Sequence, residues 1–121
     1  MTVSFTAQGN GIYVNIDQLG NITTSTDNIV WTQPIAPFRA NDAHWTFGGI
    51  VFANNYFVAY GNAIIIISTG LPGSMWESSL TVGGNWQTCL FNGTNWVLTD
   101  NLNRTATSRT DYPAIWTITQ G

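Results

Sequence analysis

Short apolar and alternating segments, separated by turn residues, make up most of the chain. Tyr56–Tyr60 and Ala63–Ser68 are examples, and both lie next to pairs that contain Asn or Gly. No segment carries apolar residues at a sustained helical spacing. Short apolar runs between turn signals are typical of β-strands. The pattern therefore predicts an all-β fold.

The same pattern occurs three times with a period near 40 residues. Trp31 and Trp76 are 45 positions apart, Trp76 and Trp116 are 40 apart, and Phe52 and Phe91 are 39 apart. Agreement among separate markers indicates an internal repeat, in which each copy is one supersecondary unit. We expect a single domain over residues 1–121, with repeats at approximately 1–40, 41–81 and 82–121.

Each repeat is expected to form four short antiparallel strands. Turn pairs that tolerate positive φ, such as Asn54-Asn55 and Asn92-Gly93, favour tight hairpins between the strands. In the first repeat Val3–Thr6 supplies a short opening strand. Gln33–Phe38 links this repeat to the second, because its prolines exclude central-strand pairing. The run Ile64–Ile67 is apolar on both sides of a strand, so we expect an inner strand covered on both faces.

The expected strands of the second repeat are Trp45–Ala53, Tyr56–Tyr60, Ala63–Ser68 and Met75–Ser79. Those of the third repeat are Trp86–Phe91, Asn95–Thr99, Arg104–Ser108 and Ala114–Thr119.

The composition favours a protein that acts through contacts. Aromatic residues make up 13% of the chain, charged residues only 7%, and there is no lysine. Protein interfaces are depleted in Lys and Glu and enriched in aromatic residues. A neutral surface rich in Asn and Thr is the alternative explanation. The net charge of −3 gives no reason to expect nucleic acid or an anionic membrane as a partner.

Few residues have the chemistry of a catalytic or metal site. His44 is the only histidine and Cys89 the only cysteine, so a His-based metal site or a catalytic triad lacks its other members. Cys89 is expected to be a buried small hydrophobic residue in a strand. No glycine-rich phosphate loop is present. We expect no enzyme activity, no metal and no cofactor.

The sequence also carries no targeting signal that we can identify. Its first residues lack the basic start and apolar run of a secretory signal. The longest apolar run, Ala63–Ile67, is too short to span a bilayer. We expect a protein that is made in the cytoplasm and is not embedded in a membrane.

The segment from Ser25 to Trp31 resembles the Asp-box, or BNR-type, repeat of β-propeller blades. It reads Ser-Thr-Asp-Asn-Ile-Val-Trp, with Asn28 where the common form has Gly, a mild change because Asn tolerates the left-handed conformation. The strand Tyr56–Gly61 is similar to a blade strand that is frequent in bacteriophage structural proteins. The second repeat keeps Ser68 and Trp76 with a longer turn, and the third keeps Ser108 and Trp116 with Asp111 shifted along.

In the Asp-box family these residues are structural. The Asp side chain accepts backbone N–H groups of the tight turn, and the Trp packs between strands. The resemblance therefore implies a scaffold role for Ser25, Asp27, Trp31, Ser68, Trp76, Ser108 and Trp116.

Three blades do not close a propeller, which normally has four to eight. A dimer that completes six blades is one solution, and a β-trefoil of three four-stranded repeats is another. A third is an open three-sheet unit whose edges are covered by neighbouring subunits, since bare edge strands recruit other chains. Two of these three arrangements require an oligomer.

The composition, the blade count and the resemblance together lead us to expect a non-enzymatic structural protein of a bacteriophage-like virion. It would decorate the capsid or form part of a tail or fibre, with itself and other virion proteins as partners. Sialidase activity, which occurs in the Asp-box family, is not expected, because the chain has three Arg, one Glu and too little length for a whole propeller. The candidate contact residues are Phe38, Arg39, Arg109 and Tyr112.

A lectin-like carbohydrate-binding module is the alternative. Sugars stack on exposed aromatic faces and take hydrogen bonds from polar side chains. Trp45, Trp86 and Trp96 lie outside the Asp-box position and are candidates for such stacking. Trp45 and Trp86 recur at one repeat position, however, so we interpret them as core residues.

Overall fold

The computed structural model describes residues 4–33, 35, 47–61, 64–70, 76–78, 85–108 and 116–119. These residues form three antiparallel sheets, each within one unit of about 40 residues. The prediction of an all-β protein with three repeats is confirmed. Within the described part of the chain no closed propeller forms.

Each sheet is a meander in which neighbouring strands are consecutive in the sequence. The first sheet contains β1 (Ser4–Gly9), β2 (Ile12–Asp17) and β3 (Ile22–Ser25). The second contains β4 (Phe47–Ala53), β5 (Tyr56–Gly61), β6 (Ile64–Ser68) and β7 (Glu77–Ser78). The third contains β8 (Trp86–Phe91), β9 (Trp96–Asp100), β10 (Thr105–Ser108) and β11 (Trp116–Thr119).

The first sheet has three described strands where four were expected. Its opening strand is also longer than predicted, since β1 continues to Gly9. The backbone N–H of Thr32 donates to the carbonyl of Thr24 at 2.9 Å, and Ile35 forms an isolated antiparallel bridge with Ile22. In the sequence a proline, which has no N–H to donate, stands at position 34 between Thr32 and Ile35. This segment therefore makes separate contacts with the edge of β3 instead of a regular fourth strand.

Asparagine and glycine with positive φ close the first hairpins. Asn10 and Gly11 join β1 to β2 with φ of 50° and 79°, and Asn54 and Asn55 join β4 to β5 with φ of 49° and 69°. Two consecutive residues with positive φ match the two-residue turn that fits the twist of a hairpin. The prediction of a turn at Asn54-Asn55 is confirmed.

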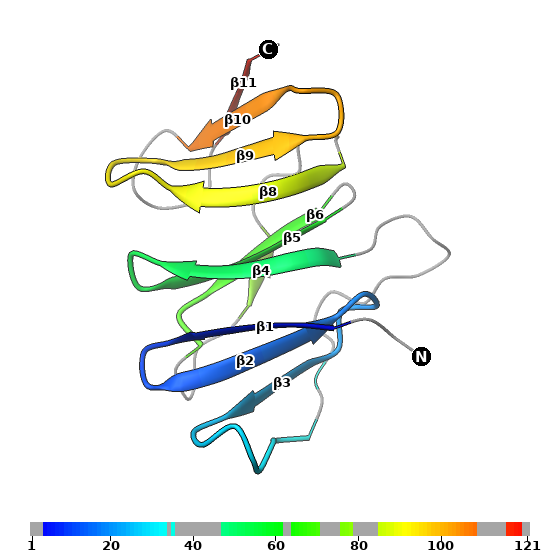
Figure 1. Ribbon diagram of the computed structural model, residues 1–121, viewed down its shortest axis with the longest axis vertical. Helices are drawn as coiled ribbons and strands as arrows, with labels where there is room; N and C mark the ends of the chain where they lie inside the picture. The colour runs from blue at the N-terminus through cyan, green and yellow to red at the C-terminus, as the bar shows by residue number, and fades with distance from the viewer. Residues whose placement is uncertain are drawn as a thin grey trace.

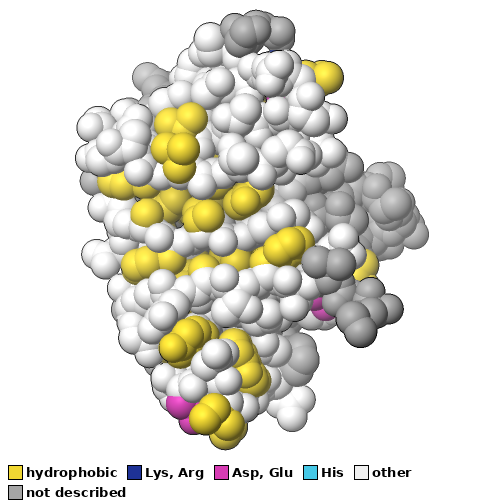
Figure 2. All heavy atoms as spheres, viewed as in Figure 1, with side chains coloured by type: hydrophobic (Ala, Val, Ile, Leu, Met, Phe, Trp, Pro, Cys, Tyr) yellow, Lys and Arg dark blue, Asp and Glu magenta, His cyan; other side chains and the backbone are white. Residues whose placement is uncertain are grey.

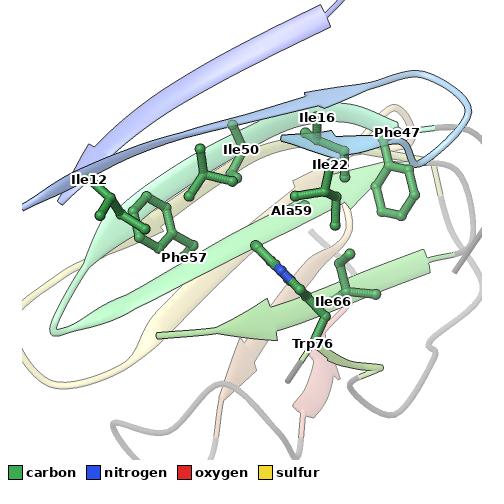
Figure 3. Packing of buried hydrophobic residues seen from close by; sticks show 10 residues of the cluster. Ile12, Ile16, Ile22, Phe47, Ile50, Phe57, Ala59, Ile66 and Trp76 are labelled. Atoms are coloured by element: carbon green, nitrogen blue, oxygen red, sulfur yellow. The ribbon is translucent and has the colours of Figure 1, made fainter. Parts of the chain in front are cut away.

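The three sheets stack on one another, with β1, β4 and β8 following each other along one side (Figure 1). One hydrophobic cluster fills the space between the first and second sheets, and another lies between the second and third. Figure 3 shows Phe57, Ala59 and Ile66 in the first of these clusters, together with side chains of β2 and β3.

The middle sheet is covered on both faces. Ile66 belongs to the cluster against the first sheet, whereas Ile65 and Ile67 belong to the cluster against the third. Successive side chains of a strand point to opposite faces, so an uninterrupted apolar run suits a strand between two layers. The prediction of a doubly covered inner strand is confirmed at these three residues.

The hydrogen-bond registers align the three sheets position by position. Asn15 of β2 lies opposite Thr6 and Thr23, Ala59 of β5 lies opposite Ile50 and Ile66, and Leu98 of β9 lies opposite Cys89 and Ala106. In the second and third sheets these positions face the preceding sheet and are buried in a hydrophobic cluster. In the first sheet all three residues are polar, and they lie on the face away from the second sheet.

The outward face of the first sheet is polar over its whole width. Asn15 Nδ2 donates to Ser4 Oγ at 3.2 Å and to Thr6 Oγ1 at 2.9 Å, so the polar side chains bond to one another across strands. Terminal units of a repeat stack need a polar outer face to remain soluble. We call this surface the front end face, and its aligned polar residues are Ser4, Thr6, Gln8, Tyr13, Asn15 and Thr23.

The outward face of the third sheet is also more polar than the corresponding face of the middle sheet, although apolar residues remain on it. Its aligned positions carry threonine at four places, together with Leu90 and Val97. The corresponding positions of the middle sheet carry Tyr60, Ile65 and Ile67, which are buried. We call this surface the back end face, and its threonines are Thr88, Thr99, Thr105 and Thr107.

Candidate functional site

Three serines end the third strand of their units, and all three are buried. The Ser25 hydroxyl oxygen accepts the N–H of Asn28 at 2.9 Å, and that of Ser68 accepts the N–H of Gly70 at 2.9 Å. Ser108 Oγ instead accepts the N–H of the neighbouring strand residue Trp96 at 2.7 Å. The side chains bond to the backbone of their own units, which is a structural use of the hydroxyl group.

Asp27 organises the turn after β3. Its Oδ1 atom accepts the N–H groups of Ile29 at 2.9 Å and Val30 at 3.0 Å, and also the hydroxyl of Ser25 at 3.0 Å. These hydrogen bonds, that from Val30 first, hold the pKa of Asp27 below its ordinary value. Asn28 adopts a φ of 63°, the left-handed conformation in which Asn can replace Gly.

A second aspartate turn occurs in the first and third units. Asp17 Oδ1 accepts the N–H groups of Leu19 and Asn21, both at 2.9 Å. Asp100 Oδ1 accepts those of Leu102 at 2.9 Å and Arg104 at 2.8 Å. The signal is present in the sequence as Asp-x-Leu-x-Asn and Asp-x-Leu-x-Arg at the end of β2 and β9.

Arg104 completes the turn in the third unit. Its Nε atom donates to Asp100 Oδ2 at 2.6 Å, in an ion pair whose carboxylate side chain is fully buried. Burial alone would raise the pKa of Asp100, but the hydrogen bonds and charge of Arg104 and the N–H of Leu102 more than offset it. The net effect lowers the pKa of Asp100, so this carboxylate is occupied in holding a turn.

The three repeat tryptophans do not have equivalent surroundings. Trp76 is buried in the cluster between the first and second sheets, and Trp116 is buried between the second and third. Trp31 belongs to neither cluster and is half-buried.

A pocket of about 580 Å³ lies at the turn after β3, and its lining includes Trp31 and Trp76. Ile12, Val30 and Ile35 contribute further apolar surface. Ligand pockets typically have volumes of about 300 to 1,000 Å³ and are mostly apolar with a few polar groups. This cavity therefore has the size and lining of a small-molecule site.

Hydroxyl groups supply the polar part of the pocket. Thr24, Ser25, Thr26 and Thr32 line it, and no charged residue of the described chain does. The Thr32 hydroxyl accepts the N–H of Thr24 at 3.0 Å, and a hydroxyl group has one donor and two acceptor sites. The pocket combines two indole rings with hydrogen-bonding groups that carry no charge.

Apolar side chains are exposed beside this pocket. Ile29 is 79% exposed, Val30 72% and Ile35 53%. We call these three residues the turn surface. Figure 2 shows hydrophobic side chains at the end of the molecule that carries β3 and its turn, as well as in rows along the seams between sheets. An exposed apolar group on a surface with little charge is typical of a contact site.

Trp86 and Trp96 are core residues. Both are almost fully buried in the cluster between the second and third sheets, which rules them out as exposed stacking platforms. Trp45 lies outside the described residues. So do the four candidate contact residues Phe38, Arg39, Arg109 and Tyr112.

Cys89 is a buried free thiol, as the sequence indicated. Burial raises its pKa to about 12, so the reactive thiolate is scarce at neutral pH. Over the described ranges, no group of three or more His, Cys, Asp and Glu residues is placed to hold a metal ion. No helix in that part of the structure is long and apolar enough to cross a membrane.

Comparison of the chain with models of protein families, with curated proteins and with solved structures finds no match. The candidate site therefore rests on its own geometry.

Proposed function

We propose that this chain is a non-enzymatic structural protein that works through protein–protein contacts at the turn surface. The observation that carries the proposal is the exposure of Ile29, Val30 and Ile35 together on a chain with only 7% charged residues. Burying apolar surface drives most protein association. The described aspartates support a non-enzymatic role, because Asp17, Asp27 and Asp100 use their oxygens to hold turns.

We propose that the chain belongs to a bacteriophage-like particle, where it decorates the capsid or forms part of a tail or fibre. The Asp-box resemblance and the scarcity of charge support this setting. Capsid or tail genes beside the gene for this chain would support it further, whereas a neighbourhood of metabolic genes would contradict it.

We also propose that the three units are propeller-like blades in an open stack. The first strands β1, β4 and β8 follow one another along one side, as the inner strands of propeller blades do. The polar front end face and the threonine-rich back end face disfavour closure of a ring by end-to-end contact. The turn surface is the better candidate for assembly.

Light scattering after gel filtration tests the assembly proposal. The wild-type chain is expected to associate more strongly as its concentration rises. The variant Ile29→Ser/Val30→Ser is expected to shift towards the monomer, because only the backbone of these residues bonds to Asp27. The matched control is Leu102→Ser, which changes a similarly exposed residue in another turn. A wild-type chain that stays monomeric at every concentration would contradict the proposal.

A carbohydrate-binding module is the second candidate. The observation that favours it is the uncharged pocket that contains two tryptophans and several hydroxyl groups. Aromatic faces and hydrogen-bonding side chains together are the chemistry by which proteins bind sugars. This function is compatible with a role on a particle surface.

A further inference from the structure

We propose that the pocket beside the turn surface binds a neutral sugar ring, with Trp31 and Trp76 as its apolar walls and threonine hydroxyls as its polar contacts. This proposal rests on the second candidate function and locates it in the molecule. The pocket shares Val30 and Ile35 with the turn surface, whereas Ile29 belongs to the turn surface alone.

The first argument is that Trp31, unlike its counterparts in the other two repeats, belongs to neither of the described hydrophobic clusters. Trp76 and Trp116 each pack in a cluster between two sheets. Trp31 is half-buried, lies in neither cluster and lines the pocket. A large amphipathic side chain next to a cavity is well suited to contact a ligand, since an indole offers an apolar face and an N–H donor.

The second argument is the match between the lining and a sugar ring. A pyranose ring presents an apolar C–H face and a rim of hydroxyl groups. The indoles provide the surface for the C–H face. Thr24, Thr26 and Thr32 provide hydroxyl groups that both donate and accept hydrogen bonds.

The third argument concerns charge. No charged side chain from the described ranges lines the pocket. A charged ligand would lose its hydration there without gaining an opposite charge, which is costly in an apolar site. The pocket is therefore expected to prefer neutral sugars to acidic ones.

Titration of the purified full chain tests the proposal. The neutral probes are methyl α-mannopyranoside, methyl β-galactopyranoside and N-acetylglucosamine, and the acidic probe is N-acetylneuraminic acid. Binding is followed by tryptophan fluorescence and by saturation-transfer NMR. At least one neutral probe is expected to bind saturably, and the acidic probe more weakly.

Variants locate the binding. Trp31→Ala is expected to raise Kd about tenfold or more, and Thr26→Val by about threefold through loss of one hydroxyl. Leu102→Ser is the matched control and should leave binding unchanged, because Leu102 is exposed in another turn and does not line the pocket. If thermal unfolding shows that Trp31→Ala does not fold, Trp31→Phe replaces it and is expected to weaken binding several-fold.

The possible outcomes distinguish an error in the location of the binding site from an error in the proposed carbohydrate-binding function. Saturable sugar binding that Trp31→Ala and Thr26→Val leave unchanged would overturn the pocket but preserve carbohydrate binding. Failure of every neutral probe to bind would overturn both. A preference for N-acetylneuraminic acid would overturn the assignment of a neutral ligand. None of these three outcomes decides the assembly proposal, which light scattering tests separately.

Discussion

The rings of Phe52 and Phe57 pack with their centroids 4.7 Å apart, on a cross-strand pair whose side chains face the first sheet. The same position in the third sheet also carries an aromatic pair, with centroids 5.4 Å apart. In the first sheet the same position lies on the front end face and carries polar groups. The aligned pairs of the third and first sheets are Phe91–Trp96 and Gln8–Tyr13.

Placing a pair of phenylalanines at Gln8 and Tyr13 should turn the front end face into an association surface. We expect the variant Gln8→Phe/Tyr13→Phe to self-associate through the front end face, because it leaves apolar rings exposed. Light scattering after gel filtration measures the change. Gln8→Thr/Tyr13→Thr is the matched control, since Thr also favours strands, and it should keep the oligomeric state of the wild type. If the aromatic variant elutes like the wild type at high concentration, the polarity of the front end face is not what prevents self-association through it.

Removal of the Ser108 hydroxyl should destabilise the third sheet. Ser108→Ala leaves the buried N–H of Trp96 without its 2.7 Å acceptor, and we expect a loss of about 1 to 3 kcal/mol in the free energy of unfolding. Urea unfolding measures it. Thr117→Ala on the exposed edge strand is the control, with an expected change within about 0.5 kcal/mol. Equal effects of the two variants would contradict a structural role for this hydroxyl.

The stability contributed by Asp100 should depend on pH. Because folding lowers the pKa of this carboxyl, its contribution is fully present above the ordinary value of about 4 and is lost as the pH falls through the folded pKa. We expect Asp100→Asn to lower Tm at neutral pH, with a smaller difference from wild type in strong acid. Thermal unfolding followed by circular dichroism over a pH series measures this.

The variant Arg104→Gln tests the same ion pair through its other partner. This variant removes the charge that pairs with Asp100 but keeps a backbone N–H at position 104. Its Tm deficit should also shrink in acid. If Asp100→Asn destabilised the protein equally at neutral and acidic pH, ionisation of the carboxyl would not be the cause.

Cys89 should resist chemical labelling in the folded protein. Burial and a pKa of about 12 leave almost no exposed thiolate at pH 8. We expect Ellman's reagent to label the native chain slowly and the urea-unfolded chain within minutes at the same pH. Rapid, stoichiometric labelling of the native protein would place the thiol at the surface instead.

Much of the fold could be predicted because its signals are local. Alternating segments located β5, β8 and β10 to within a residue, and Asn54-Asn55 marked a hairpin through its tolerance of positive φ. The fourth strand of the first unit was wrong. A fourth strand was expected to include Val30 and Trp31. The N–H of Val30 instead donates to Asp27 Oδ1, so Val30 belongs to the turn and cannot continue a regular strand.

The candidate site was harder to predict because it depends on the order of the units. Trp31 and Trp76 occupy equivalent positions of the repeat, although the turn before Trp76 is longer. Trp76 is buried in the cluster between the first and second sheets, whereas Trp31 is half-buried and belongs to neither cluster. Both line the pocket, and the sequence pattern did not indicate that they come together there. The role of the Asp17 and Asp100 side chains was not predicted for another reason: the second unit has Gly61 at the matching position, so the aspartate does not recur in all three repeats.

The polarity of the two end faces has a consequence for how such a chain can grow. A copy stacked on the front end face would meet Asn15 and its polar neighbours. A copy stacked on the back end face would meet mainly threonines, with Leu90 and Val97 as the apolar residues. Either copy would find few apolar partners. A copy of the middle unit inserted between existing units would instead meet matched apolar faces on both sides. The architecture therefore permits lengthening by internal duplication. Engineered variants with four or five sheets should be made by inserting copies of the middle unit between existing units.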